Sequence, residues 1–364
     1  MIAALQRRLA PVLRPAAAAY GAAMRLRAER YADGRSPAYR ATGPVVSIGN
    51  ISWGGSGKTP VVDYLLDTTA AAGIRTVVLT RGYKAKPQSL PCPVGLMDDP
   101  ALVGDEPLML ARRHPKALVV VDPKRGRAAA WAEANAGPGL FLLDDGMQHL
   151  AMRRDLDIVL LTPNDLLAGW NKVIPSGTWR EDARALARAH AFCIKADEAA
   201  LSAIAPVVEA RLGHLDLPLF SFTLAPGRLI RLAPFGRGPE EIAPDIGGES
   251  YVLACGTGNP EQVAQTAAAF LGREPAHAMI VADHHRYTEA DAKTMAAWRI
   301  PIVCTAKDAV KLAPLLPHFG DVPVWILDVR ADFGPAFFSA QSFDQWWAER
   351  LDAILRRNGD PDAS

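Results

Sequence analysis

The stretch from Val45 to Val62 reads V-V-S-I-G-N-I-S-W-G-G-S-G-K-T-P-V-V and decides the fold of the first half of the chain. Its first four residues are apolar or small, which predicts a buried strand. A glycine-dense turn follows, and Pro60 stands where a helix tolerates a missing N–H. Strand, turn and helix start are together typical of a phosphate-binding loop. Its candidate ATP-binding residues are Gly54, Gly55, Ser56, Gly57, Lys58 and Thr59.

The chemistry of this loop follows from its residue types. Glycines let backbone N–H groups curl round a polyphosphate, and the helix N-terminus adds partial positive charge. Lys58 is placed to reach the β- and γ-phosphates, and the Thr59 hydroxyl to ligate Mg²⁺. Ser52 departs from the usual pattern, which has glycine there. A glycine-rich turn that binds nothing is the alternative, and the flanking strand and helix argue against it.

The composition indicates an ordinary folded protein. The chain has 364 residues, 49% hydrophobic and 22% charged, which suits two domains with substantial cores. A net charge of +1 argues against a chain-wide nucleic-acid role. The four cysteines are far apart without C-x-x-C spacing, so we expect reduced thiols in a cytosolic protein.

The N-terminal segment is strongly basic. Residues 1–40 carry eight arginines against Glu29 and Asp33, a local net charge of +6. We expect a basic amphipathic helix over residues 2–31. Such a helix can lie on an anionic membrane surface, or it can pack on the first domain with a solvated basic face, and both interpretations stay open on the residues alone. No apolar run reaches the length of a transmembrane helix.

Strand and helix patterns alternate in both halves of the chain, which predicts parallel sheets. The predicted fold class is α/β, with two Rossmann-like α/β/α domains, the first of P-loop NTPase type, joined by a β-ribbon linker. The ribbon is expected over residues 219–232 with a turn at Pro226 and Gly227. The expected parts are an N-terminal helix 1–40, a P-loop domain 41–215, a ribbon and linker 216–248, a second domain 249–335 and a C-terminal helix 336–364.

Several polar residues of the first half follow expected strands or begin helices. An apolar strand over 140–143 ends in Asp144 and Asp145, one of which is favoured as a second Mg²⁺ ligand over a simple turn with Gly146. Asp105 is either a helix N-cap or a base over the phosphate loop, and the cap is favoured on the residues alone. The candidates for substrate contact, which are also explained by a solvated surface, are Arg81, Tyr83, Gln148, His149 and Asn171.

In the second half, Asp283, His284 and His285 follow an expected strand. Two histidines beside one aspartate are too few ligands for a metal on their own. They are either surface residues in a turn or an Asp–His unit that faces the first domain across a cleft.

Taken together, these motifs resemble the tetraacyldisaccharide 4′-kinase family of lipid A biosynthesis. The matching stretches span residues 44 to 312 and keep the order of the family. They are S-I-G-N-I-S-W-G-G-S-G-K-T-P, R-G-Y, G-D-E-P, L-D-D-G-M-Q-H, R-D-L-D-I-V-L-L, C-G-T-G-N-P, D-H-H-R-Y-T and T-A-K-D-A-V-K-L. The resemblance implies transfer of the γ-phosphate of ATP to the 4′-hydroxyl of a lipid disaccharide 1-phosphate. It also implies a peripheral protein on the cytoplasmic face of the inner membrane, and no protein partner is inferred.

The resemblance also assigns roles to residues. Lys58 and Thr59 would hold ATP and Mg²⁺, with Asp144 and Asp145 as the acidic group at the metal. Asp105 would be the catalytic carboxylate, His284 its partner and Asp283 the residue that orients the histidine. This reverses the preference for Asp105 as a cap and favours membrane contact by the N-terminal helix. Two departures are Met147 for the usual Phe and Ala306 for the usual Glu.

A nucleotide-dependent switch or metallochaperone-type NTPase is the alternative hypothesis, because such proteins share the G-G-x-G-K-T loop. They usually dimerise over the nucleotide, often through a lysine early in the loop. That part of the loop is Ser52 and Trp53 in this chain. Nucleotide-dependent dimerisation without any need for lipid would distinguish a switch from a kinase.

Overall fold

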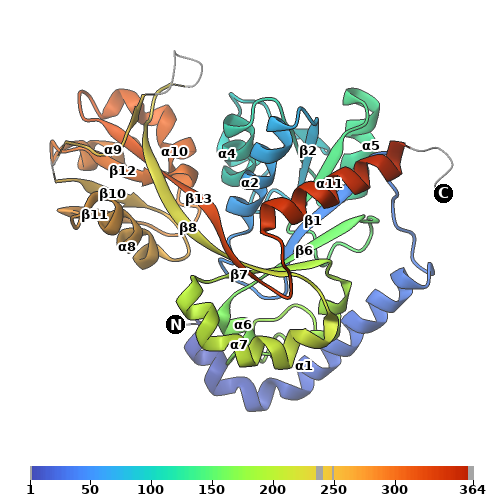
Figure 1. Ribbon diagram of the computed structural model, residues 1–364. Coiled ribbons are helices and arrows are strands. Elements are labelled where there is room, and N and C mark those ends of the chain that lie inside the picture. Colours follow the sequence, from blue (N-terminus) through green and yellow to red (C-terminus); the bar gives the residue numbers. More distant parts are fainter. Residues whose placement is uncertain (1, 235–240, 248–249, 360–364) are drawn as a thin grey trace. The chain divides into compact units, whose positions relative to one another are not determined.

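The computed structural model describes residues 2–234, 241–247 and 250–359 (Figure 1). By contacts between residues, the chain divides into two units. The first unit contains residues 1–81, 122–223 and 331–364, and the second contains residues 82–121 and 224–330. Each unit is therefore assembled from separate stretches of sequence.

The first unit is built on a parallel sheet with β1 (Val45–Asn50) at its centre. On one side of β1 lie β5 (Leu140–Asp144) and then β2 (Thr76–Thr80). On the other side lie β6 (Leu156–Leu161), β7 (Ala191–Lys195) and the start of β8 (Leu219–Arg231). The chain goes from β1 outward to β2 on one side and later to β6 on the other. The carboxyl end of β1 is thus a switch point, where open α/β sheets bind ligands.

Helices flank this sheet because its strands are buried along their whole length. The longer ones are α1 (Ile2–Ala32), α2 (Lys58–Ala71), α5 (Arg125–Ala136), α7 (Glu198–Leu212) and α11 (Phe343–Gly359). The shorter ones are α6 (Pro163–Leu166), η1 (Ala183–Arg188) and η2 (Gly213–Leu215).

Helix α1 packs on the first unit through its C-terminal half. Tyr20 lies against the apolar cluster of this unit, Arg25 forms a 2.6 Å ion pair with Asp182, and Arg27 donates to the carbonyl of Gln148 at 3.0 Å. The packed-helix interpretation is therefore confirmed for this half, whereas Val12 in the other half is 77% exposed. Across the described ranges, no helix has both the length and the apolar character needed to cross a membrane.

The second unit has its own parallel sheet, in the order β11 (His277–Ile280), β10 (Val252–Cys255), β12 (Ile302–Thr305) and β13 (Val324–Phe337). The pair β3 (Cys92–Pro93) and β4 (Leu118–Val121) is antiparallel, and β9 (Ile242–Ala243) pairs with β8. The helices are α3 (Pro100–Val103), α4 (Asp105–Arg113), α8 (Pro260–Leu271), α9 (Glu289–Ala296), α10 (Ala306–Leu312) and η3 (Ala313–His318).

The predicted α/β class is confirmed, but the division of the chain differs from the expected one. Residues 82–121 were assigned by the sequence to the P-loop domain, whereas their contacts place them in the second unit. Part of the expected ribbon and linker 216–248 lies outside the described residues.

The predicted turn at Pro226 and Gly227 is wrong, because β8 runs through both residues as one strand. Its neighbour β13 holds it extended in each unit. Ser221 donates to the carbonyl of Pro335 at 3.0 Å in the first unit, and Arg228 pairs with Asp328 at 3.0 Å in the second. These contacts override the local preference of a Pro-Gly pair for a turn. Both strands thus pass from one unit into the other.

Candidate active site

The glycine-rich loop connects β1 directly to α2, as the sequence predicts. Helix α2 begins at Lys58, and its N-cap Gly57 has a φ of 84°, a left-handed value that side chains avoid. A Cβ on Gly57 would also lie 2.8 Å from the Phe222 ring. Glycine is therefore required at this position by conformation and by space.

A cluster of charged side chains surrounds this loop within the first unit. Lys58 Nζ donates to Asn50 Oδ1 at 2.9 Å and lies 3.5 Å from Asp145 Oδ1. Arg180 donates to both carboxylate oxygens of Asp145 at 2.9 Å and to Gln148 Oε1 at 3.1 Å. The register explains the meeting, because Asp144 at the end of β5 stands opposite Ile48 of β1.

The two neighbouring aspartates have different environments. Asp144 is 9% exposed and accepts a 2.9 Å hydrogen bond from Thr80. Asp145 has a positive φ of 53°, and its side chain is 37% exposed beside Lys58. Burial by itself raises the pKa of Asp145, but Lys58 and Arg180 outweigh burial and hold this pKa below its ordinary value. Asp145 is therefore a stable carboxylate at the loop.

The donor set fits a magnesium ion that accompanies a phosphate ligand. Within the described ranges, no group of three or more His, Cys, Asp or Glu side chains could hold a metal by itself. The Thr59 hydroxyl and the aspartates supply hard oxygen ligands, which Mg²⁺ prefers, and it commonly completes its shell with waters and substrate phosphates. These residues are therefore expected to bind Mg²⁺ only together with the phosphates of a bound nucleotide.

A basic environment surrounds His149 in the same unit. Burial, and to a smaller extent the positive charges of Arg125, Arg154, Arg27 and Arg81, together lower the pKa of His149 to about 4. The Nε2 atom of His149 is buried and has no hydrogen-bond partner among the residues that the structure describes. These positive charges suit an anionic ligand.

In the structure, some of the predicted substrate residues lie close together, whereas Asn171 makes a contact that holds a loop in place. Arg81 and His149 interact electrostatically, and Gln148 adjoins Arg180. Asn171 instead accepts a hydrogen bond from the Ala183 N–H at 3.0 Å, which ties its loop to η1. Sequence reasoning missed Asn50 and Arg125. Asn50 ends the strand before the loop, whereas Arg125 is buried at the start of α5 without a local signal.

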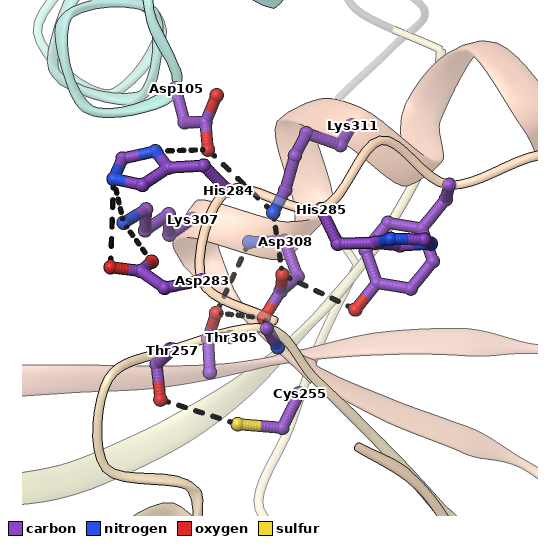
Figure 2. A network of polar contacts seen from close by, with 12 residues as sticks. Asp105, Cys255, Thr257, Asp283, His284, His285, Thr305, Lys307, Asp308 and Lys311 are labelled. Atoms are coloured by element: carbon purple, nitrogen blue, oxygen red, sulfur yellow. Dashed lines mark hydrogen bonds and ion pairs between the residues drawn. The ribbon is translucent and has the colours of Figure 1, made fainter. Parts of the chain in front are cut away.

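The second unit gathers another polar network where its parallel strands end (Figure 2). Gly256 follows β10, Asp283 and His284 follow β11, and Thr305 ends β12 and caps α10. Asp308 of α10 is fully buried and accepts hydrogen bonds from the Gly256 N–H at 3.0 Å and the Thr305 hydroxyl at 2.7 Å. This aspartate therefore joins two of the three strand ends.

Asp105 is a member of this network and not a helix cap. The N-cap of α4 is Gly104, and no side chain caps the helix. The Oδ2 atom of Asp105 lies 3.1 Å from His284 Nδ1 and 3.6 Å from Lys311 Nζ. The cap interpretation of Asp105 is therefore wrong. The N–H groups at the start of α4 follow a glycine with positive φ, and the carboxylate is turned toward the loop after β11.

The two adjacent histidines, His284 and His285, contact different carboxylates. His284 has a left-handed φ of 66°, contacts Asp105 and lies 5.4 Å from the Tyr83 ring between centroids. His285 instead contacts Asp291, a residue of the capping box of α9, at 3.3 Å. A left-handed φ such as that of His284 is uncommon for a residue other than glycine and is often found at functional sites. His284 is thus the histidine that belongs to the candidate site.

Asp105 and His284 lie in the same unit, whereas the sequence placed them in separate domains. Both also line a cavity of about 870 Å³ within the second unit. Tyr83 and Tyr287 contribute apolar surface to this cavity, and Lys311 contributes positive charge. The pair therefore faces a space that is large enough for part of a ligand.

Comparison with known proteins assigns the chain to a family. The family model of tetraacyldisaccharide-1-P 4′-kinase matches residues 9–347. A tetraacyldisaccharide 4′-kinase of Nitratidesulfovibrio vulgaris is 47% identical over 355 residues, with 98% of each chain covered. The chain belongs to the tetraacyldisaccharide-1-P 4′-kinase family. The protein of the same name from Oleidesulfovibrio alaskensis is 49% identical over 351 residues, which cover 94% of this chain and 96% of the relative.

A solved structure of this family shares the fold. It is the crystal structure from Aquifex aeolicus described as the "apo" form of LpxK in complex with ATP. Its TM-score is 0.71 at 24% sequence identity, and the match covers 95% of this chain and 99% of the other. The α/β architecture is therefore shared by a kinase of the family at low sequence identity.

The Gly57 geometry predicts unequal effects of alanine at two glycines of the loop. Gly57→Ala combines a positive φ with the close approach to Phe222, so we expect a loss on the order of 1–3 kcal/mol in the free energy of unfolding. Gly55→Ala is the matched control, because a Cβ there meets nothing within 4 Å. Urea denaturation without nucleotide measures both variants. Equal stability of the two would contradict the prediction.

The lowered pKa of His149 predicts a pH dependence of stability. The ordinary histidine value is 6.5 and the folded value is about 4, so between these values the unfolded chain binds a proton that the folded chain does not. Stability is therefore lost as the pH falls through this window. His149→Gln removes this contribution and should lose less stability than the unmodified protein between pH 7 and pH 5, measured by urea denaturation. Parallel pH curves would show that His149 titrates normally.

Proposed function

We propose that the chain transfers the γ-phosphoryl group of ATP to the 4′-hydroxyl of a tetraacyl disaccharide 1-phosphate. Membership of the tetraacyldisaccharide-1-P 4′-kinase family carries this proposal. The charged phosphate loop agrees with it, because phosphoryl transfer depends mainly on positioning and charge neutralisation. The alternative, a nucleotide-dependent switch, is not favoured by the relatives.

The first unit binds the nucleotide in this proposal. Backbone N–H groups from Gly54 to Thr59 surround the phosphates, and Lys58 neutralises the charge that develops on the transferred group. Thr59 and Asp144 or Asp145 would hold Mg²⁺, which would supply Lewis-acid charge at the phosphate oxygens. The exposed carboxylate of Asp145 beside Lys58 favours Asp145 for direct contact.

The second unit supplies the base. Asp105, positioned by its contact with His284, accepts the proton of the sugar hydroxyl as this oxygen attacks phosphorus, and the bond between the γ-phosphorus and the β-phosphate oxygen of ATP breaks. Asp283 assists in orienting His284 through Lys307, which donates to Asp283 Oδ1 at 2.7 Å and lies 3.3 Å from His284 Nε2. Substrate contacts are proposed for Arg81, Tyr83, Gln148, His149 and Asn171. The positive charge around His149 supports contact with the anionic lipid head.

Transfer of labelled γ-phosphate tests the proposed function directly. Labelled ATP and Mg²⁺ are incubated with and without a tetraacyl disaccharide 1-phosphate in detergent, and label is expected in the lipid. ATP hydrolysis that is indifferent to the lipid, together with nucleotide-dependent dimerisation, would support the switch instead.

Asp105→Asn should lower kcat by about 10²- to 10⁴-fold, because the amide cannot accept the proton. The variant keeps the size of the side chain, so the melting temperature should change little. Asp321→Asn, at an exposed position of the second unit, is the matched control and should keep full turnover. Near-normal turnover by Asp105→Asn would remove this residue from the role of base.

We also propose that the protein acts at the cytoplasmic face of the inner membrane through the N-terminal half of α1. Exposed Val12 and the neighbouring Arg14 support contact with an anionic surface. The double substitution Val12→Ser with Arg14→Ser should weaken binding to anionic vesicles several-fold, since one basic residue is worth about 1 kcal/mol there. Arg35→Ser, an exposed arginine outside α1, is the control. Unchanged vesicle binding, measured by flotation, would refute the proposal.

A further inference from the structure

Helix α10 places two lysines one turn apart on either side of the Asp105–His284 pair (Figure 2). Lys311 Nζ lies 3.6 Å from Asp105 Oδ2, and Lys307 Nζ lies 3.3 Å from His284 Nε2. Both side chains are largely buried, with 5% and 14% of their surface exposed. Long charged side chains are seldom buried without a partner that fixes them.

The position of Lys307 limits where the proton of His284 can be. Lys307 donates to Asp283 Oδ1 at 2.7 Å and lies 3.4 Å from Glu106 Oε1. Burial alone would lower the pKa of Lys307, but Glu106 and Asp283 raise it above its ordinary value. The ammonium group has only donors, so its contact with His284 is a hydrogen bond only if Nε2 is the acceptor.

A proton on Nε2 would instead face this ammonium group. The nearest carboxylate oxygen, Asp283 Oδ2, is 3.6 Å from Nε2, which is too long for a good hydrogen bond. A proton on Nδ1 is well placed to be donated to Asp105 Oδ2, because this nitrogen and this oxygen are 3.1 Å apart. One arrangement therefore satisfies both ring nitrogens.

We propose that Lys307 is a positioning residue that fixes His284 as the tautomer with its proton on Nδ1, which is donated to the carboxylate of Asp105. Only the expected effect of Lys307 on catalysis rests on the proposed function. The placement of the proton follows from the contacts of Lys307 whatever the substrate is.

Lys311 supports the same arrangement from the carboxylate side. It is anchored by an ion pair with Asp308 Oδ1 at 2.9 Å and lies 5.3 Å from the centre of the Tyr287 ring. Both His284 and Lys311 approach Oδ2 of Asp105, and Figure 2 shows the other carboxylate oxygen pointing away from them. Oδ1 is then the oxygen that receives the proton of the sugar hydroxyl. His284 holds the carboxylate in place and does not take the proton itself.

The ring nitrogens of His284 report the tautomer in the full-length protein labelled with ¹⁵N-histidine. Long-range ¹H–¹⁵N spectra distinguish a protonated from an unprotonated nitrogen, and His284→Gln identifies the signals by their loss. We expect protonated Nδ1 and unprotonated Nε2 in the unmodified protein. Lys307→Met keeps the length of the side chain and removes the donor, so its spectrum should show a mixture of tautomers.

Glu106→Gln is the matched control, because it also breaks the ion pair between Lys307 and Glu106 but keeps the donor at Nε2. Its spectrum should match that of the unmodified protein. Lys307→Arg retains donors and should restore the single tautomer. In the phosphoryl-transfer assay, Lys307→Met should lower kcat about 10- to 100-fold, as loss of outer-shell partners does in metal sites, with KM for ATP and lipid within about twofold.

A single Nδ1–H tautomer in Lys307→Met, or a proton on Nε2 in the unmodified protein, would overturn the inference. These spectra need no substrate, so they are independent of the proposed kinase activity. Absence of labelled lipid with the expected tautomers would reject the proposed function and leave the placement of the proton intact.

Discussion

Parallel strands place their carboxyl ends at one edge of a sheet, and this constraint governs both candidate sites. In the first unit it puts Asp144 beside the end of β1, so that Asp145 meets Lys58 of the phosphate loop. In the second unit it brings together the ends of β10, β11 and β12, and Asp308 accepts hydrogen bonds from residues at the ends of β10 and β12. The polar residues are far apart in sequence, but the parallel topology brings them together at the carboxyl edge of each sheet.

The sequence predicts the structure correctly where the structure depends on residues that are close together in the chain. The strand, glycine turn and helix of the phosphate loop are found at the predicted residues, because glycine conformation and helix starts depend on near neighbours. The pairing of Asp105 with His284 came from the family motifs and not from the residues alone. On the residues alone the Gly-Asp-Glu-Pro stretch favours a cap, whereas in the structure the Asp105 carboxylate contacts His284 in the loop after β11.

Long-range contacts explain what the sequence could not predict. Residues 82–121 read as a continuation of the first domain, yet their apolar and charged partners belong to the second unit. Pro226 and Gly227 favour a turn, yet β13 keeps them extended. Likewise, nothing near Arg125 in sequence marks it as part of the basic group around His149, because its burial depends on the packing of α5. The lysines of α10 are an intermediate case, in which helical spacing puts both on one face and the partners come from α4 and the loop after β11.

The two strands that pass between the units have a consequence for how the chain is made. The first unit begins with residues 1–81, but it also includes residues 331–364, which are synthesised after the whole of the second unit. Trp347 of α11 is buried and donates to Thr68 of α2 at 2.9 Å, so this contact with α2 forms only after the second unit has been synthesised. The second unit likewise needs residues 82–121 and 224–330. The first unit therefore cannot be completed before the second unit has been synthesised. This order excludes vectorial folding, in which an early domain folds completely before a later one is made.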